Sequence, residues 1–583
     1  MNPGIIGGKS VPTYGHENPH GAEIRTDGTV RFRLWAPAVE RVELEVTDAP
    51  GPLTMNACDK GWHELITDQA SAGDRYRFVL TTGMRVPDPA SRYQPEDVHG
   101  PSELVDPSRW SWSDTEWAGR PWEQAVIYEL HVGAFTPEGT FRAAIGRFDH
   151  LITLGITAIE LMPVADFPGR RNWGYDGVLP FAPDSSYGRP EDLKALVEAA
   201  HARGLMVFLD VVYNHFGPDG NYLHAYAPDY FTGRYKTPWG DAINFDGPRS
   251  AVVREFVIQN ALYWVRQFHL DGLRVDAVHA IADDSPKHIL AELSERVHDA
   301  VRNRHVHLIL ENDKNQVHWL EQFYTAQWND DVHHVLHTAI TGEDKGYYAE
   351  YSGDSTKLGR ALAEGFAFQG EIMAYRRKPR GESSGHLPPR AFVAFLQNHD
   401  QIGNRAFGDR LMATVRPRAL RAAAAVYLLL PQIPMLFMGE EFAAAQPFPF
   451  FCDFGPDLAE AVRKGRREEF ARFPEFQDPK QRARIPDPQA DATFASAKLC
   501  WDDLAEPTHQ EWLEWYRQIL AARSASIVPL LKHIRRAGSF QVLGPGAVSV
   551  RWQARESGEL VLVANLSEAP VSGFPALTCA PVW

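Results

Sequence analysis

The pattern of hydrophobic and polar positions changes twice along the chain. Before about residue 105, short runs of β-forming residues are separated by turns rich in Gly, Pro and Asp, as at 30–37, 42–46 and 76–80. Runs of this kind are typical of half-buried strands. We therefore expect residues 1–105 to form an N-terminal domain of small β modules. A connector punctuated by Pro and Asp, 86–110, is expected to lie on a surface.

From about residue 125, apolar runs alternate with segments that carry apolar residues at helical spacing. The runs expected to be strands are 125–135, 159–164, 205–212, 272–278, 307–312, 326–330, 392–400 and 435–441. Eight strand–helix units predict a (β/α)8 TIM barrel with inserted loops over 106–525. A doubly wound sheet is the alternative, but the first run ends in HVGAFTPEG and lacks the Gly-rich phosphate turn usual in that fold.

The final segment is again strand-like. FQVLG, AVSVRW and LVLVANL are short runs of β-forming residues. The predicted fold class is therefore α/β, with three domains: the N-terminal β domain over 1–105, the barrel over 106–525 and a small C-terminal β domain over 526–583.

Composition and charge limit which binding partners and which cellular compartment are expected. Lys and Arg number 59 against 75 Asp and Glu, and the resulting net charge of −16 makes nucleic acid an unlikely partner. The most apolar stretch, 422–438, is interrupted by Pro431, Gln432 and Pro434, so no membrane association is expected. The first residues lack a signal-peptide pattern, and the four cysteines form no C-x-x-C pair. A cytoplasmic protein without disulfides is expected.

Acidic residues recur where the predicted strands end. Asp210 ends the third run, Asp276 lies in the fourth, Glu311 ends the fifth and Asp400 ends the seventh. Catalytic residues of TIM barrels lie at the C-terminal ends of the strands. One such acid alone is more often a helix cap or a surface carboxylate, but the repetition favours an active site.

The spacing of these residues predicts two carboxyls with different tasks. Arg274 and Asp276 are two apart on a strand and face the same side, so the guanidinium is expected to keep Asp276 ionised, as a nucleophile requires. Glu311 follows an apolar run that is expected to raise its pKa, as a general acid requires. This pair suits glycoside hydrolysis. Asp400, beside His399, could bind sugar hydroxyls, and some of the 16 Trp could offer flat faces to sugar rings.

Four segments resemble the signature regions of the α-amylase superfamily, glycoside hydrolase family 13. They are DVVYNH (210–215), GLRVDAVHA (272–280), LILEND (308–313) and FLQNHDQIGNR (395–405). The resemblance implies that Asp276 is the nucleophile, Glu311 the proton donor and Asp400 the transition-state stabiliser. It also places Arg274, His215 and His399 on sugar-binding positions, and Asp210 on the position of a structural acid.

The resemblance implies no cofactor and no metal. Asn214 matches a position that contributes to calcium sites in some amylases, but the insertion after the third strand looks short.

Further segments resemble the trehalose-releasing members of the family. Segment 35–46 is similar to the N-terminal β-sandwich of these and of branching and debranching members, which implies that residues 1–105 form an N-terminal immunoglobulin-like β-sandwich. The other segments are 171–188, 214–231, 310–315, 327–334 and 397–411. The resemblance implies a hydrolase that cuts the α-1,4 bond next to the terminal trehalose of maltooligosyltrehalose and related α-glucans. It also implies functional pairing with a maltooligosyltrehalose synthase. The alternatives are a 1,4-α-glucan branching transferase and a non-catalytic, amylase-like glycan-binding protein.

Loop residues around the acids are expected to contact the substrate. Besides Arg274, His215 and His399, they are Trp173, Tyr175, Asp176, Val275, Ala277, Val278, His279, Gln327, Trp328, Asn329, Asp330, Asp331, Gln401, Ile402, Gly403 and Asn404. Trp173 and Trp328 are the first candidates for sugar stacking. Alternatively, Trp173 wedges a loop, and Asp330 or Asp331 caps the next helix.

Overall fold

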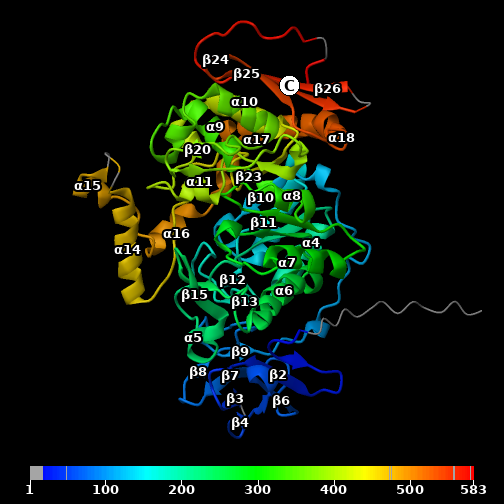
Figure 1. Cartoon of the computed structure of the whole chain (residues 1–583), viewed down its shortest axis with the longest axis vertical. Coiled ribbons are helices and arrows are strands. Elements are labelled where there is room, and N and C mark those ends of the chain that lie inside the picture. Colours follow the sequence, from blue (N-terminus) through cyan, green and yellow to red (C-terminus); the bar gives the residue numbers. More distant parts are fainter. Residues whose placement is uncertain (1–17, 48, 472, 474–475, 556–557, 578–579) are drawn as a thin grey trace, which may run out of the picture.

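Figure 1 shows the computed structural model of the chain as an elongated molecule, with an N-terminal β domain at one end, a barrel in the middle and a C-terminal sheet at the other end. The structure describes residues 18–47, 49–471, 473, 476–555, 558–577 and 580–583. No helix among these residues is long and apolar enough to cross a membrane.

Two sheets form the N-terminal β domain. One has the strand order β1 (Glu23–Ile24), β2 (Val30–Trp35), β6 (Trp62–Thr67) and β5 (Asn56–Cys58). The other has the order β4 (Leu53–Thr54), β3 (Val42–Val46), β7 (Arg75–Leu80) and β8 (Arg85–Val86), and β9 (Ser102–Glu103) also pairs with β7. Alternate side chains, such as Phe32 and Leu44, are fully buried, which confirms the strand pattern.

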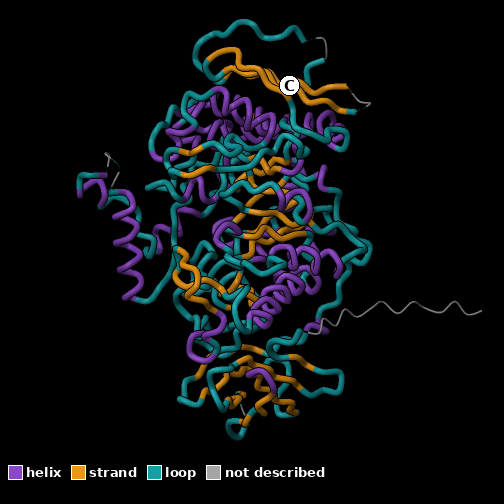
Figure 2. Tube along the Cα trace, in the orientation of Figure 1, coloured by secondary structure: helices purple, strands orange, loops and turns teal. Residues whose placement is uncertain are grey.

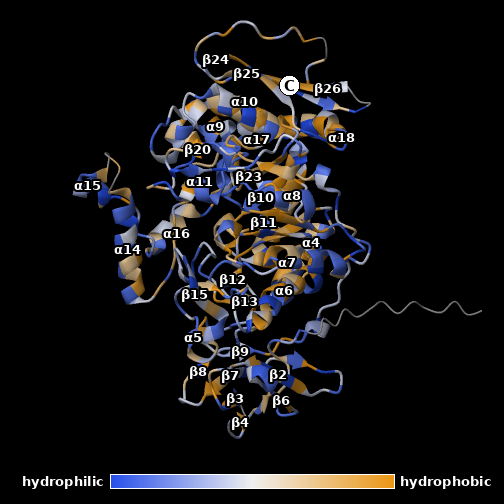
Figure 3. Cartoon of the chain, viewed as in Figure 1, coloured by the Kyte–Doolittle hydropathy of each residue, from blue (hydrophilic) through white to orange (hydrophobic). Residues whose placement is uncertain are grey.

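The barrel is closed by eight parallel strands, which confirms the predicted fold class. In order around the barrel, they are β10 (Ile127–Leu130), β11 (Ala158–Leu161), β14 (Met206–Val211), β17 (Gly272–Val275), β18 (His307–Leu310), β19 (Ala326–Trp328), β22 (Phe392–Ala394) and β23 (Ile433–Phe437). Figure 3 shows hydrophobic residues concentrated on these central strands, as expected for strands covered by helices.

Helices surround the barrel (Figure 2). The longer ones are α3 (Phe148–Leu154), α4 (Pro190–His201), α6 (Ser250–Gln267), α7 (Ile289–Ala300), α9 (Asp330–Thr341), α10 (Ser355–Glu364), α13 (Pro417–Leu429), α14 (Pro456–Phe470), α16 (Asp491–Ala497) and α17 (Pro507–Ala522). Short ones are α1 (Val132–Phe135), α2 (Phe141–Ile145), α5 (Leu223–Tyr226), α8 (His318–Gln322), α11 (His399–Gly403), α12 (Leu411–Thr414), α15 (Pro479–Arg482) and α18 (Val528–Leu531).

Small sheets complete the fold. The pairs are β12 (Ala165–Asp166) with β13 (Leu179–Pro183), β15 (Phe231–Thr237) with β16 (Gly240–Ile243), and β20 (Ile372–Met373) with β21 (Lys378–Pro379). The C-terminal sheet is antiparallel, with β24 (Ser539–Gly544), β25 (Ala547–Ala554) and β26 (Gly558–Asn565), as predicted.

All eight barrel strands are shorter than the predicted runs, and the first and seventh differ most. The first ends at Leu130 and continues as α1, and the seventh ends at Ala394. Asp400 therefore lies in the first turn of a short helix, α11, and not in a strand. The side chain of Asn398 begins this helix by accepting a hydrogen bond from Gln401 N–H at 2.8 Å.

The insertion after β14 is larger than the sequence suggested. Residues 212–249 hold α5, β15 and β16, and they join the barrel to the N-terminal domain. Ala38 N–H donates to the Tyr226 carbonyl at 3.0 Å, and the rings of Trp35 and Tyr230 lie 5.3 Å apart, edge to face. The β-sandwich is thus attached at the end of the barrel where β14 terminates.

A buried ionic cluster holds the connector at the opposite end of the barrel. His201 at the end of α4 lies between Asp114 (2.7 Å) and Asp271 (2.9 Å), and Trp117 stacks on its ring and donates to Asp271 at 2.8 Å. Burial would lower the pKa of His201, but the two carboxylates outweigh it and raise the pKa. Burial would raise the pKa of Asp114, but hydrogen bonds from His201 and His269 lower it.

We expect the substitution His201→Gln to lower stability by about 3 kcal/mol at pH 5, because it removes the cation that two buried carboxylates share. A histidine with a raised pKa contributes fully below its unfolded value of about 6.5, and an aspartate with a lowered pKa contributes fully above about 3.9. The loss should therefore be largest between about pH 4 and pH 6.5, and should shrink as the pH rises through the folded pKa of His201. Thermal unfolding at pH 5 and pH 9 checks this.

The exposed His305 at the same end of the barrel gives the control, His305→Gln. An equal loss for His201→Gln at both pH values would mean that neutral hydrogen bonds, and not charge, hold the connector.

Candidate active site

Arg274 lies at the centre of the candidate site. Its fully buried side chain extends from β17 and binds carboxylates from neighbouring strands. Nη1 donates to Asp210 Oδ2 at 2.6 Å and to Asp276 Oδ1 at 2.8 Å, and Nη2 donates to Glu311 Oε2 at 2.8 Å. One guanidinium thus holds together three of the four acids that the sequence placed at strand ends.

The chain turns sharply after Asp276, and this turn is bound to Glu311. Ala277 has φ 39° and ψ 47°, a left-handed conformation that costs a non-glycine residue about 1–3 kcal/mol. There, Ala277 N–H donates to Glu311 Oε2 at 2.9 Å, and Val278 N–H donates to the Glu311 carbonyl at 3.0 Å. The turn therefore sets the position of Glu311 relative to Asp276.

The protonation of these two acids differs from the prediction. Burial and the charge of Glu311 raise the pKa of Asp276 well above its usual value, although Arg274 opposes them. Burial also acts to raise the pKa of Glu311, but Arg274 and the Ala277 N–H outweigh it and lower that pKa. The predicted order was wrong because Arg274 reaches both carboxyls and not Asp276 alone.

Asp400 is held beside a charged histidine. His399 N–H donates to Glu129 Oε2 at 3.1 Å, and its Nδ1 binds the other oxygen of Glu129. Burial lowers the pKa of His399, but Asp400 and Glu129 outweigh it and raise the pKa to about 9. The Nε2 of His399 lies 3.6 Å from Asp400 Oδ1, to which Asn404 Nδ2 donates at 3.1 Å. Asp400 therefore faces the site with its charge partly balanced.

Aromatic side chains pack beside the acids. Tyr175 donates its hydroxyl to Asp210 Oδ2 at 2.6 Å, and its ring stacks on His399 at 5.1 Å. The ring of His215 stacks on Trp239, in the turn between β15 and β16, with centroids 4.4 Å apart and planes 9° apart. Trp239 is 47% exposed, so its other face is open to solvent.

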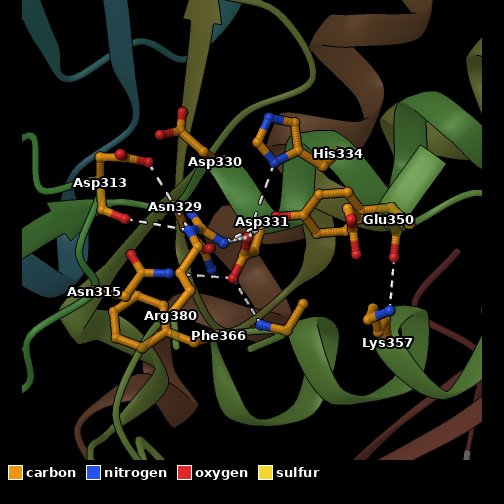
Figure 4. Close-up of polar contacts among 12 residues, drawn as sticks. Asp313, Asn315, Asn329, Asp330, Asp331, His334, Glu350, Lys357, Phe366 and Arg380 are labelled. Carbon is orange, nitrogen blue, oxygen red and sulfur yellow. Dashed lines mark hydrogen bonds and ion pairs between the residues drawn. The ribbon is translucent and has the colours of Figure 1, made fainter. Parts of the chain in front are cut away.

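Asp331 is buried in a structural network (Figure 4). It accepts hydrogen bonds from Arg380, from Tyr351 at 2.7 Å and from Ala367 N–H at 2.8 Å. Burial acts to raise the pKa of Asp331, but Arg380 and His334 outweigh it and lower that pKa. Asp331 therefore joins α9 to the loops around Arg380, and the structure does not present it to a substrate.

Asp330 points the other way. Figure 4 shows its carboxyl turned away from the network of Asp331 and Arg380. It accepts a hydrogen bond from Gln401 Nε2 at 3.4 Å. Burial, with the charges of Glu311, Asp313 and Asp400, raises its pKa to about 8, although Arg380 opposes them. Asp330 is thus an uncharged carboxyl on the side of the site where α11 begins.

The two tryptophans first predicted as sugar-stacking surfaces are buried instead. Trp328 is 2% exposed, and its ring lies 4.1 Å from the guanidinium carbon of Arg274. Trp173 is 4% exposed and stacks on Phe448. Both rings support catalytic-site residues, since Trp173 also packs edge-on against His399.

The other predicted contacts divide into two groups. Buried within the structure are Val275, Val278, Gln327, Asn329, Ile402 and Gly403. Gln327 donates to Asn315 Oδ1, and Asn329 donates to Gly365 O and Gln432 Oε1. Partly or fully exposed are Tyr175, Asp176, His215, His279, Asp330, Gln401 and Asn404. Asn329, and neither Asp330 nor Asp331, occupies the N-cap position of α9.

Sequence reasoning missed Glu129, Glu160 and Trp239. Glu129 and Glu160 lie side by side in β10 and β11 and are fully buried. Their signal was an acid within an otherwise apolar strand, which is costly unless it has a task. Trp239 lies in a hairpin far from the motifs, and no local pattern marked it. Among the described residues, no group of three or more His, Cys, Asp or Glu side chains is placed to hold a metal ion.

Two protein-family models match the chain. The model of the alpha-amylase catalytic domain matches residues 104–234 and 244–524, and a domain of unknown function matches 535–578. The first match covers more than half of the chain.

Known relatives are similar over nearly all of their length. A malto-oligosyltrehalose trehalohydrolase of Saccharolobus solfataricus is 43% identical over 86% of each chain, and one of Deinococcus radiodurans is 42% identical over 92% of this chain and 88% of the relative. A crystal structure from Salmonella typhimurium, whose assignment as an alpha amylase is provisional, superposes with a TM-score of 0.92 at 45% identity and covers 97% of this chain and 96% of that one.

Trp328 and Trp239 should respond differently to substitution. We expect Trp328→Leu to lower stability by about 2–4 kcal/mol, because it removes a buried ring, and to lower kcat more than it raises KM, because Arg274 loses its stacking partner. Trp239→Ala should change stability by less than about 0.5 kcal/mol and raise KM. Thermal unfolding and steady-state kinetics on an α-1,4-glucan check both. A stable Trp328→Leu protein with only a raised KM would restore Trp328 as a sugar-stacking residue.

Proposed function

Because this chain belongs to the alpha-amylase family and is similar over most of its length to malto-oligosyltrehalose trehalohydrolases, we propose that it is a retaining glycoside hydrolase that releases trehalose. It cuts the α-1,4-glucosidic bond next to the terminal trehalose of maltooligosyltrehalose and leaves a shorter maltooligosaccharide. The observation that carries the proposal is the binding of Asp210, Asp276 and Glu311 by one buried Arg274, with Asp400 held nearby.

Glu311, Asp276 and Asp400 have different roles in the reaction. Glu311 protonates the glycosidic oxygen while Asp276 attacks the anomeric carbon, so the bond to the leaving sugar breaks and a covalent glycosyl ester forms. Glu311 then takes a proton from water, whose oxygen attacks the same carbon and releases the ester. Two inversions retain the α configuration. The carboxylate of Asp400 stabilises the positive charge that develops on the sugar in each transition state.

One proton must lie on Glu311 before the bond breaks. In the free protein, burial and the charge of Glu311 raise the pKa of Asp276, while Arg274 and Ala277 N–H outweigh burial and lower the pKa of Glu311. When the sugar occupies the site, positive charge at the anomeric carbon favours ionised Asp276, and the glycosidic oxygen offers Glu311 a hydrogen-bond acceptor. The proton therefore passes to Glu311. The roles follow from position and not from the resting protonation.

The leaving trehalose binds on the side of the site where Asp330 lies. Its uncharged carboxyl, with the Gln401 amide beside it, offers both hydrogen-bond donors and acceptors to sugar hydroxyls. His215 and the exposed face of Trp239 provide an apolar surface for a glucose ring of the maltooligosaccharide part of the substrate. A site with paired charges and aromatic faces suits a neutral sugar.

The source of the substrate and the compartment follow from the same proposal. An enzyme that builds a terminal trehalose on a maltooligosaccharide, a maltooligosyltrehalose synthase, must supply this one. A cytoplasmic location is supported by Cys58, Cys452 and Cys500, which are free thiols.

Product analysis tests the proposal. We expect maltopentaosyltrehalose to give trehalose and maltopentaose, while maltoheptaose is cut much more slowly and amylose gains no branches. Chromatography of the products at equal enzyme concentration checks this. Branched product without new reducing ends would identify a branching transferase, and binding without turnover would identify a glycan-binding protein.

Substitution of the two central acids separates their roles. We expect Asp276→Ala to abolish turnover of both maltopentaosyltrehalose and an α-maltosyl fluoride, because neither can form the ester. Glu311→Gln should lose at least about 10³-fold on the first substrate, but with the fluoride, whose leaving group needs no proton, it should still form the ester and release about one equivalent of fluoride per enzyme in a burst. Steady turnover of the fluoride should then be slow, because the water that releases the ester lacks its general base. Fluoride release measured beside trehalose release checks this, and substantial turnover by Asp276→Ala would exclude it as nucleophile.

A further inference from the structure

Helix α14 reaches the turn that follows α11. It lies at the side of the molecule with α15 and α16 (Figure 1), and most of its surface is exposed. Arg466 is different, because only 9% of its side chain is exposed. Its Nη2 donates to the Gly403 carbonyl at 2.7 Å and to the Arg405 carbonyl at 3.1 Å. A side chain from a peripheral helix thus closes the end of the helix that carries Asp400.

The two carbonyls bound by Arg466 flank Asn404. Asn404 itself donates to Asp400 Oδ1 at 3.1 Å. On its other side the turn is confined by Trp173, because a Cβ added to Gly403 would lie 2.0 Å from that ring. The backbone on both sides of Asn404 is therefore fixed, by Arg466 from outside and by Trp173 from inside.

Apolar contacts hold the arm against the same turn. Ala406 forms a buried cluster with Phe470 of α14 and Ile485, and Phe407 packs against it. The guanidinium of Arg466 lies 4.7 Å from the Phe470 ring and 5.9 Å from that of Phe450. Burial lowers the pKa of Arg466, although its ion pair with Glu469 at 3.2 Å opposes this effect. The buried guanidinium is therefore bound on one side by Glu469 and on the other by the carbonyls of the turn.

We propose that Arg466 is a positioning residue for Asp400. It acts through the turn 403–405, which it holds so that the Asn404 amide meets the Asp400 carboxylate. The inference rests on the proposed function, since it assigns Arg466 to the placement of the transition-state stabiliser. The arm formed by α14 is then part of the catalytic architecture, although it lies outside the barrel.

Kinetics of Arg466 variants test the inference. We expect Arg466→Ala to lower kcat at least about tenfold with KM changed less than about threefold, because a small displacement of a reacting group costs turnover more than binding. Arg466→Lys should fall between, since its ammonium can donate to the carbonyls but lacks the second nitrogen, which binds Glu469, and the planar group beside Phe470. The control is Arg467→Ala on the same helix. In the part of the chain that the structure describes, the hydrogen bonds to this turn come from Arg466 and not from Arg467.

A double-mutant cycle separates positioning from general support. If Arg466 acts through Asn404, adding Arg466→Ala to Asn404→Ala should lower kcat less than about twofold further. Multiplied single effects, or wild-type kcat in Arg466→Ala, would overturn the inference. All variants are assayed well below their melting temperatures, on whichever α-1,4-glucan the wild type cleaves. Failure of the wild type to release trehalose would then refute the proposed function, while the ratios between variants still judge Arg466.

Discussion

The guanidinium of Arg274 is the interaction on which the site depends. It is buried among three carboxyl groups, so one positive charge stands against as many as three negative charges. This imbalance makes full ionisation costly, and at least one proton remains in the group. A retaining glycosidase needs one such mobile proton. The residues around Arg274 keep that charge in place: Trp328 covers its face, and Tyr175 donates to the same oxygen of Asp210 that Arg274 binds.

The barrel brings these groups together through its strand register. Asp210 of β14 pairs directly with Arg274 of β17, which in turn pairs with Ile309 of β18. These three residues lie at one height along the barrel, and Glu311, two residues after Ile309, lies just beyond it. Asp276 follows the end of its strand, and the left-handed Ala277 turns the chain so that its N–H meets Glu311. Parallel strands therefore set the level of the acids, and one strained residue sets their relative orientation. Neither contribution would suffice alone, because carboxyls must be placed within fractions of an ångström.

Sequence periodicity could predict the eight strands and the acids at their ends, because burial of both faces makes each strand an apolar run that a functional acid interrupts or terminates. It could not predict how neighbouring acids differ. Asp330 and Asp331 are adjacent, yet Arg380, far along the chain, pairs with Asp331 alone. The resting protonation of Asp276 and Glu311 was likewise out of reach, since it depends on a second donor of Arg274 and on the backbone of Ala277. The burial of Trp328 was also out of reach, because composition reveals an aromatic excess but not which rings are buried.

The charge distribution explains how a protein with net charge −16 can bind a neutral sugar. Each acid of the site is paired or protonated: Asp210 and Glu311 with Arg274, Asp400 with His399, Asp331 with Arg380, while Asp330 has a pKa of about 8. Sugar hydroxyls donate and accept hydrogen bonds, so a site of bare carboxylates could satisfy only their donors. Protonation of Asp330 and the amides of Gln401 and Asn404 supply the missing donors. The burial that makes the acids reactive thus also makes them suitable partners for a substrate without charge.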